Sequence, residues 1–216
     1  MPRLTKARIL SEALALLDEV GSEALTMRRL ADQLDVQAGA LYWHYPNKQS
    51  LVTAMAEEML ADTALHGAGE PEKWRARVVE ALMALRRALL AHRDGGRVFA
   101  GTFVPEPNTL ALGEVLLGAL RDAGLGKKEA AWSCSSLVDF VIGFVVEEQA
   151  AQGIEPDLLT SQLDREKYPN VAAVKGPFTS QDFDARMKFG VNLLLDGIER
   201  GLESRSASSG SRTRRA

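Results

Sequence analysis

The 216-residue sequence has a single cysteine and few aromatic residues, which make up 6% of the chain. One cysteine cannot form an internal disulfide, so the chain suits a reducing compartment and we expect it to be cytoplasmic. The sequence also lacks a signal-type leader and any run of the roughly 18 apolar residues that a membrane-spanning helix needs. Its most apolar stretch, 137–146, is short and is interrupted by Asp139. We therefore expect no membrane partner.

The sequence shows no arrangement that is typical of an enzyme. Cys134 lies between serines with no histidine nearby, so a small buried thiol is its simplest interpretation. The scattered histidines and the one cysteine have no metal-ligand spacing. The tripeptide 92–94 (His-Arg-Asp) is like part of a kinase catalytic loop, but no Gly-rich phosphate loop or Asp-Phe-Gly accompanies it. We expect no catalytic site, no metal and no cofactor.

Positive charge is not in excess either. The formal net charge is −3, and residues 1–48 hold six Lys/Arg against six Asp/Glu. This balance argues against a DNA-architectural or nucleoid protein, which needs a basic surface. Sequence-specific DNA binding stays open, because the acidic residues can lie on helix faces turned away from a duplex. Arg28, Arg29 and Lys48 flank a candidate recognition segment.

What the sequence does contain is helical periodicity without strand alternation, which predicts an all-α fold. Gly21 ends a first amphipathic helix, and Thr26 is a suitable N-cap for a second. We expect a third helix of about two turns, ended by Pro46, and a fourth that starts after Asn47. The third is predicted over 37–44, the fourth over 48–66, and longer helices over 71–92, 107–123, 127–152 and 181–203, with a short turn of helix after 95–96. We expect 153–179 to be an irregular connection and the Ser/Gly-rich tail, 204–216, to be disordered.

Residues 26–45 have the layout of a helix-turn-helix, in which a short reading helix holds its outer side chains clear of the core. Leu30, Leu34 and Leu41 can form the core between the two helices. The small residues 38–40 permit close approach to a groove, and the aromatic residues 42–44 would lie outside, where their N–H and O–H groups can bind phosphates. An alternative from the residues alone is that 41–45 is a packed aromatic cluster.

Two stretches, 21–31 (GSEALTMRRLA) and 40–48 (ALYWHYPNK), resemble the N-terminal domain of the tetracycline-repressor family. The resemblance implies a three-helix helix-turn-helix domain, 1–47, and a larger helical ligand-binding and dimerisation domain, 48–203. It implies a ligand-responsive transcription regulator, here a homodimeric repressor of a palindromic operator. At 38–40, where tetracycline repressors carry Gln-Pro-Thr, this chain has Ala-Gly-Ala, so we expect a different operator. The residues expected to bind DNA are Thr26, Arg28, Gln37, Ala38, Gly39, Ala40, Tyr42, Trp43, His44 and Lys48.

The resemblance continues more sparsely into the second domain, at 86–102 and 143–149. Tetracycline repressors bind the magnesium of the drug through a histidine at the position of Phe99, and carry polar drug-contacting side chains at the positions of Ala64 and Ala81. Val138 replaces another of their polar residues. All four residues are apolar here. The one carboxylate that matches the family, Glu147, would be a poor magnesium site by itself, because magnesium needs several oxygen ligands. We therefore expect a small lipophilic effector other than magnesium-tetracycline, with a filled core as the alternative. The residues expected to line the pocket are Leu85, Phe99, Thr102, Leu116, Leu117, Cys134, Val138 and Glu147, the last being equally consistent with a surface or interface acid.

The predicted helices 127–152 and 181–203 have wider apolar faces than one small domain can cover. In the family that the chain resembles, the matching helices form a four-helix bundle between subunits, so we expect a homodimer through these two. Asp139 in the first helix is interpreted either as an interface or switch residue or as a hydrogen-bonded buried acid. The two recognition helices of such a dimer would lie about 34–36 Å apart and read successive major grooves.

Overall fold

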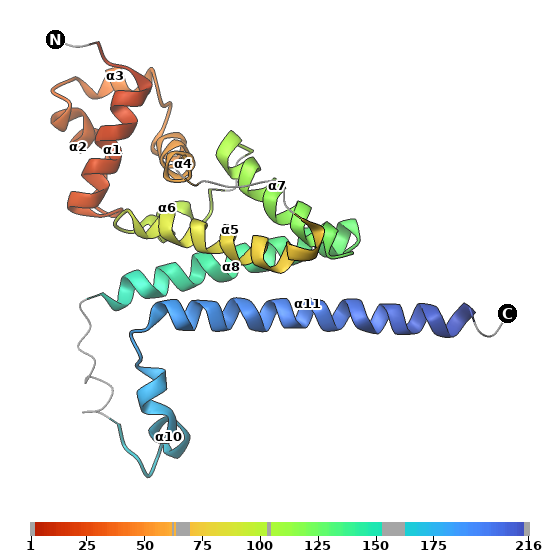
Figure 1. The fold of residues 1–216 in the computed structure, drawn as a ribbon. Helices are drawn as coiled ribbons and strands as arrows, with labels where there is room; N and C mark the ends of the chain where they lie inside the picture. Colours follow the sequence, from red (N-terminus) through yellow and green to blue (C-terminus); the bar gives the residue numbers. More distant parts are fainter. Residues whose placement is uncertain (1–2, 62, 64–69, 103–104, 153–162, 214–216) are drawn as a thin grey trace.

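The computed structural model describes residues 3–61, 63, 70–102, 105–152 and 163–213. All regular elements of these residues are helical, as predicted. A small bundle of α1 to α3 lies at one end of the molecule, and α4 connects it to a body of longer helices (Figure 1). In chain order the elements are α1 (Lys6–Val20), α2 (Met27–Gln33), α3 (Ala38–Tyr42), α4 (Lys48–Met59), the 3-10 turn η1 (Pro71–Lys73), α5 (Trp74–Leu90), α6 (Gly95–Phe99), α7 (Pro107–Asp122), α8 (Lys127–Ala151), α10 (Pro169–Phe178) and α11 (Phe183–Thr213).

Two helix starts that the sequence predicts are confirmed. The Thr26 hydroxyl accepts a hydrogen bond from the Arg29 N–H at 3.2 Å and so caps α2. Asn47 and Ser50 form a reciprocal capping box at the start of α4. Each cap satisfies a backbone donor that the first helical turn leaves unpaired. The Asn47 cap therefore fixes where the chain leaves the small bundle and α4 begins.

One apolar core runs from the small N-terminal bundle into the body. Leu51, Met55 and Met59 on α4 are buried, as their i+4 spacing predicts. Helix α4 contacts α1 on one side and α6 and α7 on the other. Within the body, α5 packs against both α7 and α8. Because α4 touches both parts of the molecule, a shift of α6 or α7 can reach the N-terminal bundle through it.

The corner between α5 and α6 is a close approach of two backbone segments. A Cβ on Gly95 would lie 2.0 Å from the carbonyl oxygen of Leu89, so only glycine fits there. Gln149 of α8 fixes the corner from outside. Its amide nitrogen donates to the His92 carbonyl at 2.7 Å, and its Oε1 accepts from the Gly96 N–H at 3.1 Å. The hydrogen bonds of Gln149 therefore fix the start of α6 relative to α8.

The largest differences from the prediction are the end of α4, the presence of α10 and the end of α11, while α3 and α5 are shorter than predicted by a few residues. Helix α4 ends at Met59, well before 66, although 62 and 64–66 lie outside the described residues. Helix α10 lies inside 153–179, which we predicted to be irregular. It buries no residue, so it lacks the apolar stripe by which a helix is recognised in a sequence. Pro169 is tolerated in its first turn, because backbone N–H groups at that position make no hydrogen bond within the helix. Of the predicted irregular connection, 153–162 lies outside the described residues.

The end of α11 also differs from the prediction. Helix α11 runs to Thr213, so the disordered tail predicted from 204 is not what the structure shows, and 214–216 lies outside the described residues. The physical reason is that extending an existing helix costs far less than nucleating one, and serine and arginine are tolerated in helices.

Helix α8 is the one helix of the described residues that is long and apolar enough to cross a membrane by length and composition. This is weak support for a membrane span, because core helices of soluble proteins pass the same test. The helix packs against α5, α6, α7 and α11.

Candidate nucleic-acid interface and internal cavity

Helices α2 and α3 form the unit in which the sequence predicts a helix-turn-helix. Leu30, Leu34 and Leu41 are all buried, so the predicted core between the two helices is present. The chain turns between them at Asp35, which has a positive φ of 54°. Aspartate tolerates this left-handed conformation better than most residues. The turn brings α2 and α3 into contact.

Among residues 41–45, at the end of α3 and just after it, some side chains point outward and others point inward. Trp43 is 91% exposed and Tyr42 48% exposed, whereas Leu41 and Tyr45 are buried. The Tyr45 hydroxyl donates to the Lys6 carbonyl at 3.5 Å, and burial raises its pKa. A packed aromatic cluster over 41–45 is therefore the wrong interpretation for Tyr42 and Trp43. Large exposed aromatics on a short helix are available to a partner.

The ten positions predicted to bind DNA lie at the start of α2, in α3 and directly on either side of it, and at the start of α4. None of them is buried. No heavy atom outside its own neighbourhood lies within 4 Å of where a Gly39 Cβ would be, so the space in front of α3 is open there. The Lys48 ammonium donates to the Ser22 carbonyl at 3.4 Å, and the Thr26 hydroxyl caps α2. The structure describes these placements; DNA contact by each residue stays a prediction.

A polar junction joins the end of α1 to the α5–α6 corner. The Asp94 carboxylate accepts from the Ser22 N–H at 2.8 Å and from the Ser22 hydroxyl at 2.9 Å. These hydrogen bonds, the backbone one first, hold the pKa of Asp94 below its ordinary value. Asp18 accepts from the Arg93 N–H at 2.9 Å and lies 3.0 Å from the His92 ring nitrogen Nδ1. No sequence pattern signals this junction, because its partners are more than 70 residues apart.

A second junction joins α4 to the start of α7. The Glu57 carboxylate accepts hydrogen bonds from the N–H groups of Asn108 and Thr109 and from the Thr109 hydroxyl. The Asn108 amide in turn donates to the Glu57 carbonyl at 3.2 Å. A carboxylate at a helix N-terminus is favoured because the first N–H groups there have no partner within the helix. Helix α4 therefore caps α7.

A cavity of about 230 Å³ lies beside this junction, between α6, α7 and α8. Its walls are mostly apolar, with a few hydroxyls and one carboxylate, as is typical of sites for small organic ligands. The lining residues are Phe99, Gly101, Thr102, Thr109, Leu112, Gly113, Leu116, Cys134, Ser135, Val138, Asp139 and Ile142. Thr109 belongs both to this wall and to the Glu57 junction.

Of the residues predicted to line the pocket, Phe99, Thr102, Leu116, Cys134 and Val138 surround this one cavity. The other three do not line it: Leu85 is fully buried in the core, Leu117 is half-buried, and Glu147 is exposed. The exposure of Glu147 fits the alternative interpretation of a surface or interface acid.

Leu112 and Ile142 also line the cavity wall, although they were not among the predicted pocket residues. Each lies four residues from a predicted wall residue, so extending the helical stripe by one turn would have found them. Asp139 was noticed but interpreted as an interface, switch or buried acid. It is exposed and lies on the cavity wall. Nothing in its sequence context signals a cavity.

The described cavity wall has no strongly nucleophilic group and no cluster of metal ligands. Burial raises the pKa of the Cys134 thiol, so this cysteine is a neutral, weakly nucleophilic group. No group of three or more His, Cys, Asp or Glu side chains that could hold a metal occurs among the described residues. Ala81 is buried, and Ala64 lies outside the described residues. The arrangement suits binding of an organic molecule.

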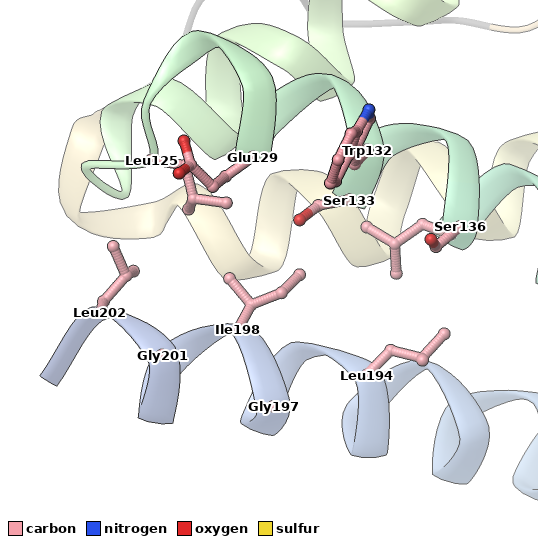
Figure 2. A pocket seen from close by; sticks show the side chains of 11 residues that line it. Leu125, Glu129, Trp132, Ser133, Ser136, Leu194, Gly197, Ile198, Gly201 and Leu202 are labelled. Atoms are coloured by element: carbon pink, nitrogen blue, oxygen red, sulfur yellow. The ribbon is translucent and has the colours of Figure 1, made fainter. Parts of the chain in front are cut away.

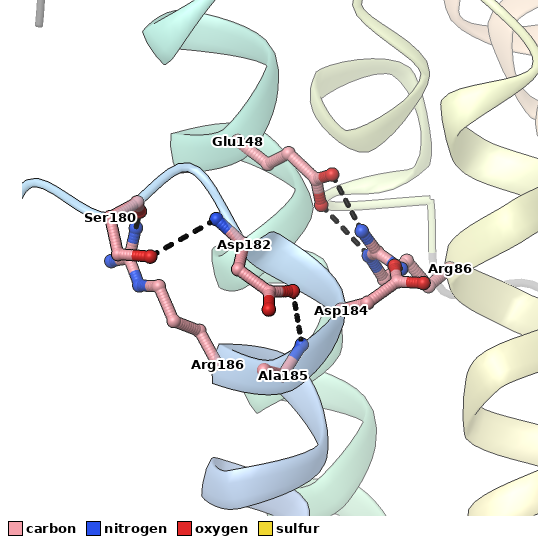
Figure 3. A network of polar contacts seen from close by, with 7 residues as sticks. All are labelled: Arg86, Glu148, Ser180, Asp182, Asp184, Ala185 and Arg186. Carbon is pink, nitrogen blue, oxygen red and sulfur yellow. Dashed lines mark hydrogen bonds and ion pairs between the residues drawn. The ribbon is translucent and has the colours of Figure 1, made fainter. Parts of the chain in front are cut away.

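A buried ion pair ties three body helices together (Figure 3). Arg86 of α5 donates through Nε and Nη2 to the two carboxylate oxygens of Glu148 of α8, at 2.8 and 2.6 Å. Its Nη1 donates to Asp184 of α11. Arg86 and Glu148 are both buried. The geometry orients all three helices, because a planar guanidinium donates hydrogen bonds to carboxylates only in fixed directions.

Helices α8 and α11 also border an open groove of about 380 Å³. Figure 2 shows side chains from both helices turned toward it. Leu194 and Ile198 line it from α11, and Leu137 and Trp132 from α8. Trp132 is 65% exposed, and further along α11 Phe189 is 67% exposed. The two helices predicted to form a dimer interface thus carry exposed apolar side chains.

Comparison with known proteins gives a consistent result over almost the whole chain. Residues 9–55 match the family described as bacterial regulatory proteins, tetR family, and residues 68–202 match the tetracyclin repressor-like, C-terminal domain. The chain is 35% identical over 208 residues to the tetracycline repressor protein class G of Vibrio anguillarum, covering 93% of this chain and 96% of that protein.

Two solved structures from Streptomyces coelicolor have the same fold. One is a possible TetR family transcriptional regulator from strain A3(2), with a TM-score of 0.82, 45% identity, and coverage of 91% of this chain and 99% of the other. The second is the TetR family protein ActR in complex with actinorhodin, with a TM-score of 0.82, 34% identity, and coverage of 93% and 98%. A helix-turn-helix with exposed aromatics, a helical body with a cavity, and these matches agree: the chain belongs to the tetracycline-repressor family of bacterial regulatory proteins.

Proposed function

We propose that this chain is a homodimeric transcriptional repressor that binds a palindromic operator and leaves it when a small lipophilic effector occupies the cavity. In this proposal residues 1–47 bind DNA and residues 48–203 bind the effector and the second subunit. The protein acts in the cytoplasm, where its operator lies, and carries out no catalysis.

The observation that carries the proposal is a continuous path from the cavity to the reading helix. Thr109 lies on the cavity wall and donates two hydrogen bonds to Glu57. Glu57 is on α4, which starts at the Asn47 cap, five residues after α3 ends. A molecule that displaces Thr109 moves the acceptor on α4, and α4 moves the base of α3. A coupling of about 1–3 kcal/mol along such a path changes operator affinity by about 5- to 150-fold.

Operator binding is supported by the exposed face of α3. Tyr42 and Trp43 extend from it, and the small residues 38–40 allow it to approach a groove closely. Arg28 on α2 and Lys48 on α4 supply positive charge on either side of α3 and are both exposed. Because 38–40 are short apolar residues, base readout rests on apolar contacts, such as Ala40 against a thymine methyl, and on Arg28 and Thr26.

Dimerisation is supported by the apolar surface of α8 and α11. Trp132, Phe189 and Leu193 are exposed large apolar side chains on these two helices. Water contact with so much apolar surface is unfavourable, and a second copy that packs α8 and α11 against their equivalents removes it. A dimer places two α3 helices about 34–36 Å apart, which suits a palindrome read on one face of DNA.

An effector other than magnesium-tetracycline is supported by the cavity wall. Phe99 and Val138, which are apolar, stand on that wall. Divalent magnesium needs several oxygen ligands in octahedral order, and Asp139 is the one carboxylate among the described wall residues. The wall favours an organic molecule that brings no metal ion.

The test begins with selection of bound sequences from random DNA, followed by band-shift titration on the selected site. We expect a palindrome of about 15–20 base pairs bound by two chains, since its half-sites must lie about one helical turn apart. Equal affinity for all sequences would contradict the repressor and favour an architectural protein, although the net charge of −3 disfavours that class.

A further inference from the structure

The described cavity wall carries a single charged group, and its charge is negative. Among the described lining residues Asp139 is the one carboxylate, and none is Lys, Arg or His. The remaining polar lining groups are neutral hydroxyls and the Cys134 thiol, and the Thr102 hydroxyl already donates to the Phe99 carbonyl at 2.6 Å. The wall is thus apolar with a single negative charge.

Asp139 belongs to the face of α8 that borders the cavity. The α8 wall residues follow helical spacing from Cys134 through Val138 to Ile142, with Ser135 and Asp139 on the adjoining stripe. Val138 and Ile142 are half-buried, whereas Ser135 and Asp139 are exposed. The carboxylate therefore lies toward the mouth of the cavity, where the charge keeps part of its hydration.

The Asp139 side chain has no hydrogen bond or ion pair with any residue in the described part of the chain. Its neighbour Ser135 is already engaged, since its hydroxyl donates to the Ala131 carbonyl at 3.2 Å. Asp139 is thus the one charged side chain among the described wall residues, and it is available to a ligand. Its charge repels carboxylates and phosphates, and it attracts an ammonium group that reaches the mouth from inside.

We propose that the effector is an amphiphilic cation, in which an apolar or aromatic body lies against Phe99, Leu112 and Leu116 and a basic nitrogen pairs with Asp139. The inference rests on the proposed function, because it takes the cavity as the effector site. Apolar burial supplies most of the affinity, and the ion pair selects among bodies of equal size. A role of Asp139 in a subunit contact would give no selectivity for charge in the cavity.

The test uses three ligands that share one bicyclic body and differ in their polar group: 1-naphthylmethylamine, 1-naphthalenemethanol and 1-naphthoic acid. Binding to the full chain is measured by isothermal titration calorimetry at neutral pH and about 0.1 M salt. We expect the amine to bind about three- to tenfold more tightly than the alcohol, a modest preference because its ion pair with Asp139 stays partly exposed to water. The acid should bind most weakly.

The same titration with Asp139→Asn assigns the preference to this residue. We expect the amine to lose its advantage while the alcohol keeps its affinity. Glu114→Gln is the matched control, because Glu114 is an exposed acid on α7 beside the wall residue Gly113 and does not line the cavity. It should leave the order of the three ligands unchanged.

Equal binding of the three ligands, tighter binding of the acid, or an amine preference that survives in Asp139→Asn would overturn the inference. These results leave the proposed repressor intact, since operator binding is measured separately and Asp139→Asn should bind the operator as the unaltered chain does. Failure of all three ligands to bind would contradict both the inference and the use of this cavity as an effector site.

Discussion

Glu57 of α4 accepts two hydrogen bonds from Thr109 of α7, one from the backbone N–H at 3.1 Å and one from the hydroxyl at 3.0 Å. Thr109 also lies on the cavity wall. This pair is a direct link between the cavity wall and α4, the helix that follows α3. Charge-assisted hydrogen bonds of this kind are about twice as strong as neutral ones, so we expect Glu57 to follow Thr109 when a ligand displaces it.

Replacing Glu57 by Gln should weaken this link. The amide keeps one acceptor and loses the charge, so we expect the free energy of unfolding in urea to fall by about 1–2 kcal/mol. We also expect ligand in the cavity to lower operator affinity less than it does for the unaltered chain. Glu58→Gln is the control, because Glu58 is exposed and lies next to Glu57. Equal effects of the two substitutions would contradict a specific role for Glu57.

Replacing Trp43 by Ala should reduce DNA affinity without changing stability. The side chain is 91% exposed, so its loss removes almost no packing within the chain. If its N–H binds a phosphate, about tenfold weaker binding is expected for the operator and for random DNA alike. The two affinities are measured by band shift at one salt concentration, and Tyr168→Ala, an exposed aromatic substitution on the distant N-cap of α10, serves as the control. A loss confined to the operator would show base readout instead of a backbone contact.

Removing one partner of the Arg86–Glu148 pair should be among the most destabilising changes in the body. Replacing Glu148 by Leu leaves a buried guanidinium without its bidentate partner, for which about 3–5 kcal/mol is expected. The double variant Arg86→Met with Glu148→Leu should recover much of that loss, because it buries no unpaired charge. Urea unfolding at a fixed protein concentration measures both, since a dimer gains stability with concentration. Additive losses in the double variant would contradict a coupled pair.

The Asp94–Ser22 junction should weaken on acidification. The pKa of Asp94 is lowered in the folded chain, first by the Ser22 N–H. A lowered pKa stabilises the fold above the ordinary carboxyl pKa of about 3.9, and this contribution is lost as the pH falls through the folded value. Asp94→Asn should therefore be less stable than the unaltered chain at pH 7, and the difference in Tm should shrink toward pH 3. Asparagine tolerates the positive φ of 55° at this position, which isolates the effect of charge. A Tm difference that does not change with pH would argue against the ionised carboxylate as the source.

Local features of this fold could be predicted from the sequence, and long-range ones could not. The Thr26 and Asn47 caps, the buried Leu30 and Leu41, and the outward Trp43 follow from residue type and helical spacing alone. The predicted bounds of α7 and α8 agree with the structure to within one residue. Five of eight pocket residues were found because wall residues follow the same periodicity as core residues.

The remaining features depend on which helices meet, and this is not encoded in any short window. Glu57 and Thr109 are 52 residues apart, and Ser22 and Asp94 are 72 apart. Leu85 and Phe99 have the same apolar character in the sequence, yet Leu85 faces the core interior and Phe99 the cavity. Helix α10 escaped prediction because it buries nothing.

The central claim is that filling the cavity weakens operator binding, and Cys134 allows a direct measurement. It is the single cysteine of the chain and lies on the cavity wall. Modification with benzyl methanethiosulfonate at mildly alkaline pH, where more of this thiol is ionised, adds an apolar ring at that wall as a mixed disulfide. Operator affinity is then measured by band shift before and after the group is removed with dithiothreitol. Cys134→Ser treated in the same way controls for the reagent. We predict that the modified chain binds its operator at least about fivefold more weakly, with affinity restored by the thiol. Unchanged affinity in a fully modified chain of unchanged Tm would contradict the account.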